Sequence, residues 1–414
     1  ANSVKSAMQA ALDSTALMLS KEAATDTPAQ LQANGTAYFK ALFNRPDAPN
    51  PVITASYTTA GGSSVVVNGS APMQTNFMGI FGYNTINING TSTTKWGSTR
   101  LRVALALDNT GSMSSDGKMT ALKSATKSLL GQLQAAASNN GDVYVSIIPF
   151  SKDVNVGSTY YNANWIDWDD WDDDNGHDNS TQTCTSTKTG KNGKSTKKCT
   201  TTTTWVPDNH NTWNGCITDR DMTQVPNTTT DYDQSAQNPD PTVPASLFPA
   251  EQYGSCPVAM MGLNYNWASM SSLVDSMQPN GNTNQPIGLV WAWQSLVGGG
   301  PLVAPLTSSD YQYQKIIILL SDGLNTEDRW YSSQSQVDNR MYQTSNGSGT
   351  CANIKASGIT IYTIQVNTGG DPTSTLLKNC ASDSTKFFIV TSANQILTTF
   401  NKIGTGLTQL RVAQ

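Results

Sequence analysis

The sequence predicts an α/β fold with a doubly wound, mainly parallel sheet of the Rossmann-like kind, a large irregular insertion and a small N-terminal α+β unit. Strongly apolar segments of strand length recur from residue 101 onward, and helical patterns separate them. This order favours parallel strands joined by right-handed crossovers. Nearly all-apolar strands are typical of a sheet that is buried on both faces. The predicted strands are 101–107, 143–148, 315–320, 359–364 and 386–390.

The N-terminal unit is predicted from a change of periodicity. Residues 1–45 carry apolar residues at helical spacing, and prolines at 46, 49 and 51 end that pattern. Residues 52–95 alternate β-branched and polar residues, and we interpret their Gly-Gly and Asn-Gly pairs as turns. A short helix is predicted around 77–81. We therefore expect one unit over 1–97 and a second domain over 98–414.

Helices are predicted between the strands of the second domain. A Gly/Ser loop follows the first strand, and the helix after it has Met119, Leu122 and Leu129 on one face. Regular pattern resumes near Trp267, and further helices are expected over 285–297, before Ala356 and in the C-terminal segment.

Residues 154–262 interrupt this order. They contain an acidic run with nearby tryptophans, a Thr/Ser/Lys tract of low complexity and Pro-rich polar sequence. We predict an irregular surface insertion that adds nothing to the core. Asp170, Asp172 and Asp174 resemble the start of a calcium-binding loop, but its closing Glu is missing. A solvated acidic loop is our interpretation, and a loose Ca²⁺ site is the alternative.

Composition limits the function. Only 13% of the 414 residues are charged, the net charge is −5, and Thr, Ser and Asn are abundant. No nucleic acid is expected as the main partner, because phosphate binding needs clustered Lys and Arg. Two histidines exclude a His-rich zinc site. Asp supplies 27 of the 30 acidic residues, which favours oxygen-liganded cations such as Mg²⁺ or Ca²⁺.

Six well-spaced cysteines favour disulfides and an oxidising compartment, with six free thiols as the alternative. No Cys-x-x-Cys motif for zinc or redox chemistry is present. Six cysteines allow fifteen pairings. Sequential pairing is preferred, since each bridge then closes a local loop: Cys184–Cys199, Cys216–Cys256 and Cys351–Cys380.

Oxygen-bearing side chains follow two of the predicted strands. The first strand runs into Asp108-x-Thr110-x-Ser112, and the strand at 315–320 runs into Ser321-Asp322-Gly323. A third loop, before the helix at 285, adds Thr283. Open α/β sheets bind ligands at the carboxyl ends of their strands, so we expect these groups to converge. The predicted cation ligands are Asp108, Thr110, Ser112, Thr283 and Asp322, with Mg²⁺ favoured over Ca²⁺ or Mn²⁺.

These motifs resemble the metal-ion-dependent adhesion site of von Willebrand factor type A domains. The resemblance covers roughly 100–414 and is interrupted by the insertion. Thr110 stands where that family usually has Ser, and the gap between Ser112 and Thr283 exceeds the family's norm. The resemblance implies a von Willebrand factor A-like domain and a cation with an open position that accepts a partner's carboxylate.

The flanking segments resemble TadG-type assembly proteins of bacterial Tad pili. The matching segments are 9–17, 108–113, 213–216, 289–293 and 380–411. That family carries a hydrophobic N-terminal anchor. The resemblance therefore implies an extracytoplasmic protein (periplasmic, outer-membrane or cell-surface) that is tethered to a membrane by a segment before Ala1.

We therefore expect an adhesion or pilus-assembly protein, not an enzyme, whose partners are pilus or envelope components. One alternative is a structural pilus component with a vestigial metal site. A less favoured alternative is a metal-dependent hydrolase, which lacks a His or Glu near the motif to act as general base.

Overall fold

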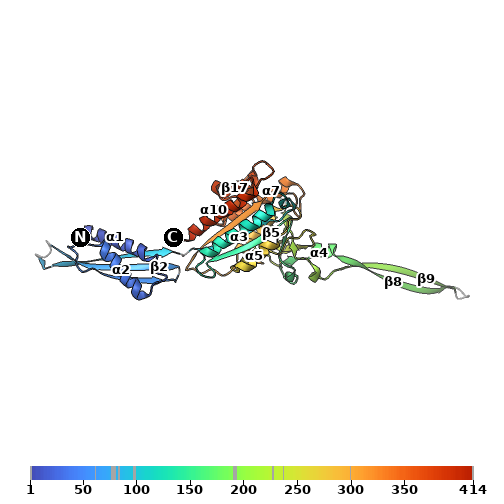
Figure 1. The fold of residues 1–414 in the computed structure, drawn as a ribbon. Coiled ribbons are helices and arrows are strands. Elements are labelled where there is room, and N and C mark those ends of the chain that lie inside the picture. Colours follow the sequence, from blue (N-terminus) through green and yellow to red (C-terminus); the bar gives the residue numbers. More distant parts are fainter. Residues whose placement is uncertain are drawn as a thin grey trace. The chain divides into compact units, whose positions relative to one another are not determined.

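The computed structural model describes residues 2–60, 62–75, 81–82, 84–96, 99–189, 194–225, 228–235, 237–298 and 300–412. The chain divides into two compact units (Figure 1). The first contains residues up to 100, with 307–313 and the C-terminal segment from 406. The second contains 101–306 and 314–405.

The first unit consists of two helices and a three-stranded antiparallel sheet. Strand β2 lies between β1 and β3, α1 packs on β2 and β3, and α2 packs on β1. A capping box formed by Thr27 and Gln30, with Pro28 at the first helical position, begins α2. The elements are α1 (Asn2–Leu19), α2 (Pro28–Leu42), β1 (Val52–Thr58), β2 (Ser63–Gln74) and β3 (Thr85–Trp96).

Two Asn-Gly pairs that the sequence pattern suggested as turns lie inside strands instead. Gly69 of β2 and Gly90 of β3 face each other across the sheet. A Cβ atom on either glycine would lie within 3 Å of the Leu12 side chain of α1. The glycines therefore let a fully buried leucine approach the backbone of the sheet. The short helix expected around 77–81 falls mostly outside the described residues.

The second unit is built on a ten-stranded sheet with the order β17-β16-β15-β4-β5-β6-β10-β13-β7, and β14 pairs with β5. The pairs β4–β5, β15–β16 and β16–β17 are parallel. The α/β class with a large sheet and a parallel centre is thus confirmed. The central strands are β4 (Thr99–Asp108), β5 (Val143–Phe150), β15 (Gln312–Ser321), β16 (Thr360–Val366) and β17 (Phe387–Val390).

Helices cover both faces of the central strands. Ala104 and Ala106 of β4 belong to a core with α6, α8 and α9, whereas Leu105 points to the other face and is also fully buried. On that face α3 contacts β5 and packs beside α5. The helices are α3 (Lys118–Ala136), α4 (Asp169–Asp174), α5 (Trp267–Ser276), α6 (Gln285–Leu296), α7 (Gln334–Met341), α8 (Thr350–Ala356), α9 (Thr375–Cys380) and α10 (Ala393–Val412).

The insertion is more ordered than the sequence predicted. It extends the sheet with short strands, and Trp171 and Trp213 are buried in the same core as α6. These residues bury a large apolar area, which irregular loops do not. The strands that extend the sheet are β6 (Val154–Asn155), β7 (Ile166–Asp167), β10 (Cys216–Ile217), β13 (Phe248–Glu251) and β14 (Met261–Asn264). Strands β11 (Met222–Val225) and β12 (Thr228–Asp231) form a separate antiparallel pair.

The low-complexity tract also forms regular structure. Strands β8 (Gly176–Thr189) and β9 (Lys194–Pro207) pair as a long antiparallel ribbon, with α4 at its base (Figure 1). Low complexity suggested a loop, but threonine favours strands, and cross-strand pairing satisfies the backbone of this tract without a core.

All six cysteines form disulfides in sequential order. Cys184 and Cys199 face each other across the β8–β9 ribbon. Cys351 of α8 is bonded to Cys380 of α9. Cys216 of β10 is bonded to Cys256. Cys256 lies just after Tyr253, whose hydroxyl accepts a hydrogen bond from the Asn282 N–H.

We predict that replacing Cys216 and Cys256 by Ser lowers the free energy of unfolding by about 4 kcal/mol, because this bridge closes a loop of 40 residues. Denaturant titration under non-reducing conditions measures the change. Replacing Cys184 and Cys199 is the comparison, since their bridge closes a loop of 15 residues and should cost less, about 3 kcal/mol. Equal losses in both variants would contradict the prediction.

Candidate metal centre

The candidate site begins where the neighbouring strands β4 and β15 end. Asp108, the last residue of β4, is fully buried. Its Oδ2 accepts a 2.6 Å hydrogen bond from the hydroxyl of Ser321, the last residue of β15. Its Oδ1 accepts a 2.8 Å hydrogen bond from the backbone N–H of Thr110. The buried carboxylate therefore fixes the first loop and joins the two strand ends.

A second set of contacts connects the loops in front of Asp108. The Ser112 hydroxyl donates a 2.6 Å hydrogen bond to Asp322 Oδ1. The hydroxyls of Thr110 and Ser112 are 3.0 Å apart. A Cβ atom on Gly323 would lie 3.6 Å from the Ser112 hydroxyl and 3.8 Å from the Thr283 hydroxyl. The hydroxyls of Ser112 and Thr283 thus lie close to one point beside Gly323.

The loop that carries Thr283 is held on both sides. The Gly281 carbonyl accepts a 3.0 Å hydrogen bond from the Gly111 N–H, which ties this loop to the first one. Gly281 has φ of +84°, and a Cβ atom there would lie 2.6 Å from the Tyr253 hydroxyl. Glycine is therefore required at this position for both backbone conformation and space. Thr283 donates its N–H to the Thr326 hydroxyl at 2.8 Å.

The predicted residues separate into two groups. Ser112, Thr283 and Asp322 line a cavity of about 520 Å³ that also contains Gly323 in its wall. Asp108 and Thr110 lie behind this wall, 0% and 1% exposed. The first group lines the cavity, and Asp108 is connected to it by its hydrogen bonds with Ser321 and with the Thr110 N–H.

The buried carboxylate has an altered proton affinity. Burial and, to a smaller extent, the negative charge of Asp322 together raise the pKa of Asp108 to about 6, although the hydrogen bonds from Ser321 and Thr110 oppose the rise. A positive charge near these two carboxylates relieves their repulsion.

One positive charge comes from the chain itself. The Lys118 ammonium donates hydrogen bonds to Asp322 Oδ2 at 2.6 Å and to the Ser112 carbonyl at 3.1 Å. The site thus already holds a cation against one of its carboxylates. In the described part of the chain, no group of three or more His, Cys, Asp or Glu side chains is placed to hold a metal. The candidate set combines two carboxylates with three hydroxyls, a donor chemistry that fits a hard cation completed by water.

Lys118 and Tyr253 also contact this site and were not predicted from the sequence, and Ser321 was named only as part of its motif. Lys118 left a signal, since a lysine in the first turn of a helix opposes the helix dipole and requires a compensating anion. Tyr253 left none, because it reaches the loop only through the fold of the insertion.

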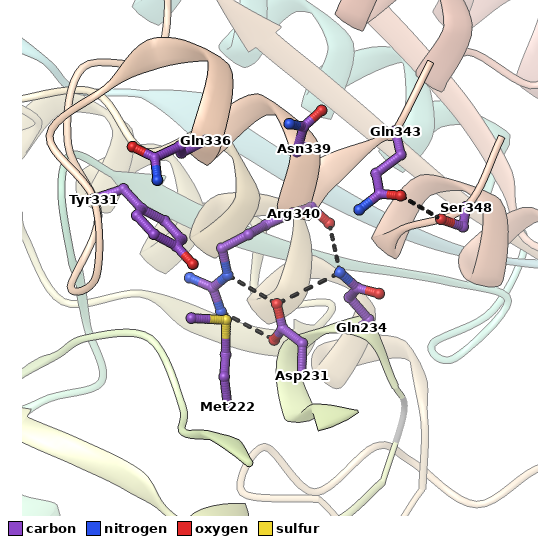
Figure 2. Close-up of a pocket in the computed structure, with 9 residues that line it drawn as sticks. All are labelled: Met222, Asp231, Gln234, Tyr331, Gln336, Asn339, Arg340, Gln343 and Ser348. Carbon is purple, nitrogen blue, oxygen red and sulfur yellow. Dashed lines mark hydrogen bonds and ion pairs between the residues drawn. The ribbon is translucent and has the colours of Figure 1, made fainter. Parts of the chain in front are cut away.

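A second cavity, of about 430 Å³, lies between the insertion and α7 (Figure 2). At its floor, Asp231 accepts hydrogen bonds from Arg340 Nε at 2.8 Å and Nη2 at 3.0 Å. Arg340 is 5% exposed and also pairs with Asp219, Asp233 and Asp328. Burial raises the pKa of Asp219 to about 7, and Arg340 opposes this rise. This network anchors the insertion to α7.

Comparisons with known proteins give distant structural likenesses. No family model and no curated protein matches the chain. The vWF domain of the type V pili tip protein Mfa5 from Porphyromonas gingivalis is similar with 11% identity and a TM-score of 0.37, over 76% of this chain and 96% of that one. The pilus adhesin SpaC from Lactobacillus rhamnosus GG has 14% identity and a TM-score of 0.36, over 89% and 35%.

Proximal thread matrix protein 1 from the mussel byssus, solved with a zinc-occupied MIDAS motif, has 14% identity and a TM-score of 0.35. That match covers 75% of this chain and 46% of the mussel protein. The chain therefore spans less than half the length of the mussel protein and of SpaC. Similarity at this level assigns neither a ligand nor a partner to the present chain.

The raised pKa of Asp108 predicts a pH dependence of the metal-free protein. Between pH 4 and pH 6 the folded state retains a proton that the unfolded state has lost, so the contribution of Asp108 to stability is present at low pH and lost as pH rises. The loss amounts to at most about 3 kcal/mol. Chemical denaturation of wild type and Asp108→Asn in chelator, at several pH values, measures it. A stability difference between the two proteins that does not change with pH would contradict the prediction.

The Arg340 network predicts a large loss of stability. Arg340→Met leaves four buried carboxylates without their shared cation and should cost about 3–5 kcal/mol in unfolding free energy. Arg45→Met is the control, because its ion pair with Asp47 is solvent-exposed. Similar denaturation midpoints for the two variants would show that the network contributes nothing.

Proposed function

We propose that this protein is an exported adhesion or pilus-assembly protein that binds its partner through a divalent cation. Asp108, Thr110, Ser112, Thr283 and Asp322 would hold the cation, with Mg²⁺ favoured. The observation that carries the proposal is the convergence of the Ser112, Thr283 and Asp322 oxygens on one open cavity, with the buried Asp108 behind them. When bound, the cation supplies an open coordination position for a carboxylate oxygen of a protein partner.

The proposal places the domain among doubly wound von Willebrand factor A-like domains of the TadG type. It also places the protein outside the cytoplasm. Three disulfides support an oxidising compartment. None of the described helices is both apolar and long enough to cross a bilayer. Membrane tethering and pilus or envelope partners rest on the sequence resemblance alone.

A second candidate function is a structural pilus component whose metal site is vestigial. The contact between Lys118 and Asp322 favours it, because an internal ammonium already neutralises one carboxylate. A hydrolase is less well supported. In the described part of the chain, the cavity wall includes neither His nor Glu to act as a general base.

We predict that Thr283→Val weakens Mn²⁺ binding at least tenfold, because the substitution removes a hydroxyl from the cavity wall. It changes no charge, so other effects on the site should be small. Thr283→Ser keeps the hydroxyl and should bind as wild type does. Isothermal titration with Mn²⁺ measures affinity, and thermal unfolding in chelator confirms that both variants fold.

Partner binding is tested with intact cell envelopes in Mg²⁺ or in chelator. Adhesion that requires Mg²⁺ and is lost in Thr283→Val supports the cation-bridged mechanism. Adhesion that is unchanged in Thr283→Val, despite lost Mn²⁺ binding, would favour the vestigial site. Turnover of an added ester or phosphate substrate that disappears in Thr283→Val would favour the hydrolase.

A further inference from the structure

Lys118 occupies an unusual position for a lysine. It is the first residue of α3, and its side chain is 9% exposed. The preceding Gly117 has φ of +70° and provides no side-chain cap for the helix. Both the helix dipole and the loss of water disfavour an ammonium here. The Asp322 carboxylate and the Ser112 carbonyl must therefore compensate for its burial.

These contacts place the ammonium in the cavity wall. Each of the two carboxylate oxygens of Asp322 accepts a hydrogen bond. Oδ2 accepts from Lys118, and Oδ1 accepts from the Ser112 hydroxyl. A cation that takes Asp322 as a ligand has to share this carboxylate with Lys118 or displace it. Two other acids, Asp116 and Asp371, line the cavity, but both are exposed to solvent, which screens their charge.

The charges of the inner site determine what it attracts. At neutral pH, Asp108 and Asp322 contribute two negative charges and Lys118 contributes one positive charge. A divalent cation would bring this sum from −1 to +1. Without Lys118 the loaded site would be neutral. The lysine therefore repels the incoming cation, but it leaves the loaded site positive and attractive to an anion.

We propose that Lys118 is the specificity-determining residue of this site. Its fixed positive charge weakens the binding of the divalent cation and strengthens the binding of a partner's carboxylate. This inference rests on the proposed cation-binding function. A net positive site in a partly buried cavity favours an acidic side chain over a neutral hydrogen-bonding group, in agreement with the carboxylate partner of the proposed function.

The test compares Lys118→Met with Lys127→Met. Both variants remove one lysine charge from α3, but Lys127 pairs with Asp275 at the surface and away from the cavity. Mn²⁺ affinity is measured by isothermal titration. Acetate, the simplest carboxylate, is then titrated into the Mn²⁺-saturated proteins and followed by water-proton relaxation. We expect Lys118→Met to bind Mn²⁺ at least tenfold more tightly and acetate at least threefold more weakly, and Lys127→Met to match wild type.

Thermal unfolding gives an independent readout. Lys118→Met in chelator leaves Asp108 and Asp322 without a counter-charge, so it should melt below wild type, and Mn²⁺ should raise its melting temperature more than that of wild type. If Lys118→Met does not fold in chelator, Lys118→Gln tests the same charge. Its amide still donates a hydrogen bond to Asp322.

The outcomes separate this inference from the proposed function. Equal Mn²⁺ and acetate affinities in wild type and Lys118→Met would overturn the role of Lys118 and leave the cation site standing. Binding of Mn²⁺ by Lys118→Met but not by wild type would support the role of Lys118 and refute cation binding by the natural chain. No Mn²⁺ binding by any of the proteins would overturn both.

Discussion

The 2.6 Å hydrogen bond from the Ser321 hydroxyl to the Asp108 carboxylate joins the ends of two central strands, and the geometry of the site follows from it. Apolar packing buries β4 on both faces and carries Asp108 out of water. A buried carboxylate is stable only where hydrogen-bond donors surround it, and Ser321 and the Thr110 N–H supply them. In front of these contacts, the Ser112 hydroxyl donates a hydrogen bond to Asp322, and both residues line the cavity. Core packing of the sheet thus determines where the oxygen atoms of the candidate site meet.

The centre of the fold could be predicted from the sequence because it depends on local pattern. Apolar runs of strand length identify the parallel strands, and oxygen-bearing residues after two of these runs identify the loops of the site. The insertion could not be predicted in this way. Its short strands, such as β10, pair with partners far along the chain, and a two-residue strand has no recognisable periodicity. Gly69 and Gly90 were misinterpreted for a related reason. An Asn-Gly pair favours a turn locally. Here glycine is needed because the Leu12 side chain packs directly against the backbone of the sheet, and that contact depends on tertiary packing.

Lys118 shows why part of the site was hidden. The sequence predicts Asp and hydroxyl residues at strand ends as cation ligands, because the oxygen chemistry of these residue types is known. A lysine in the first turn of a helix indicates that an anion lies nearby, but it does not identify Asp322 as that anion, because the contact depends on where α3 begins. The consequence is chemical. Under the proposal, two carboxylates and one ammonium would balance attraction for a metal against attraction for an acidic partner, whereas the carboxylates and hydroxyls alone suggest only the first.

The insertion holds the loop that carries Thr283 in position. Asn284, next to Thr283, donates its side-chain N–H groups to the Lys152 carbonyl at 3.0 Å and to Asp219 Oδ2 at 2.8 Å. Asp219 belongs to the insertion and pairs with Arg340 of α7. The Tyr253 hydroxyl, held near the Cys216–Cys256 bridge, accepts a hydrogen bond from the Asn282 N–H at 3.1 Å. The loop of Thr283 is therefore braced from two sides by the segment that looked least structured in the sequence. Because the ligands of a cation must be held within a fraction of an ångström, a disturbance of the insertion would reach the proposed cation site without touching any of the proposed ligands.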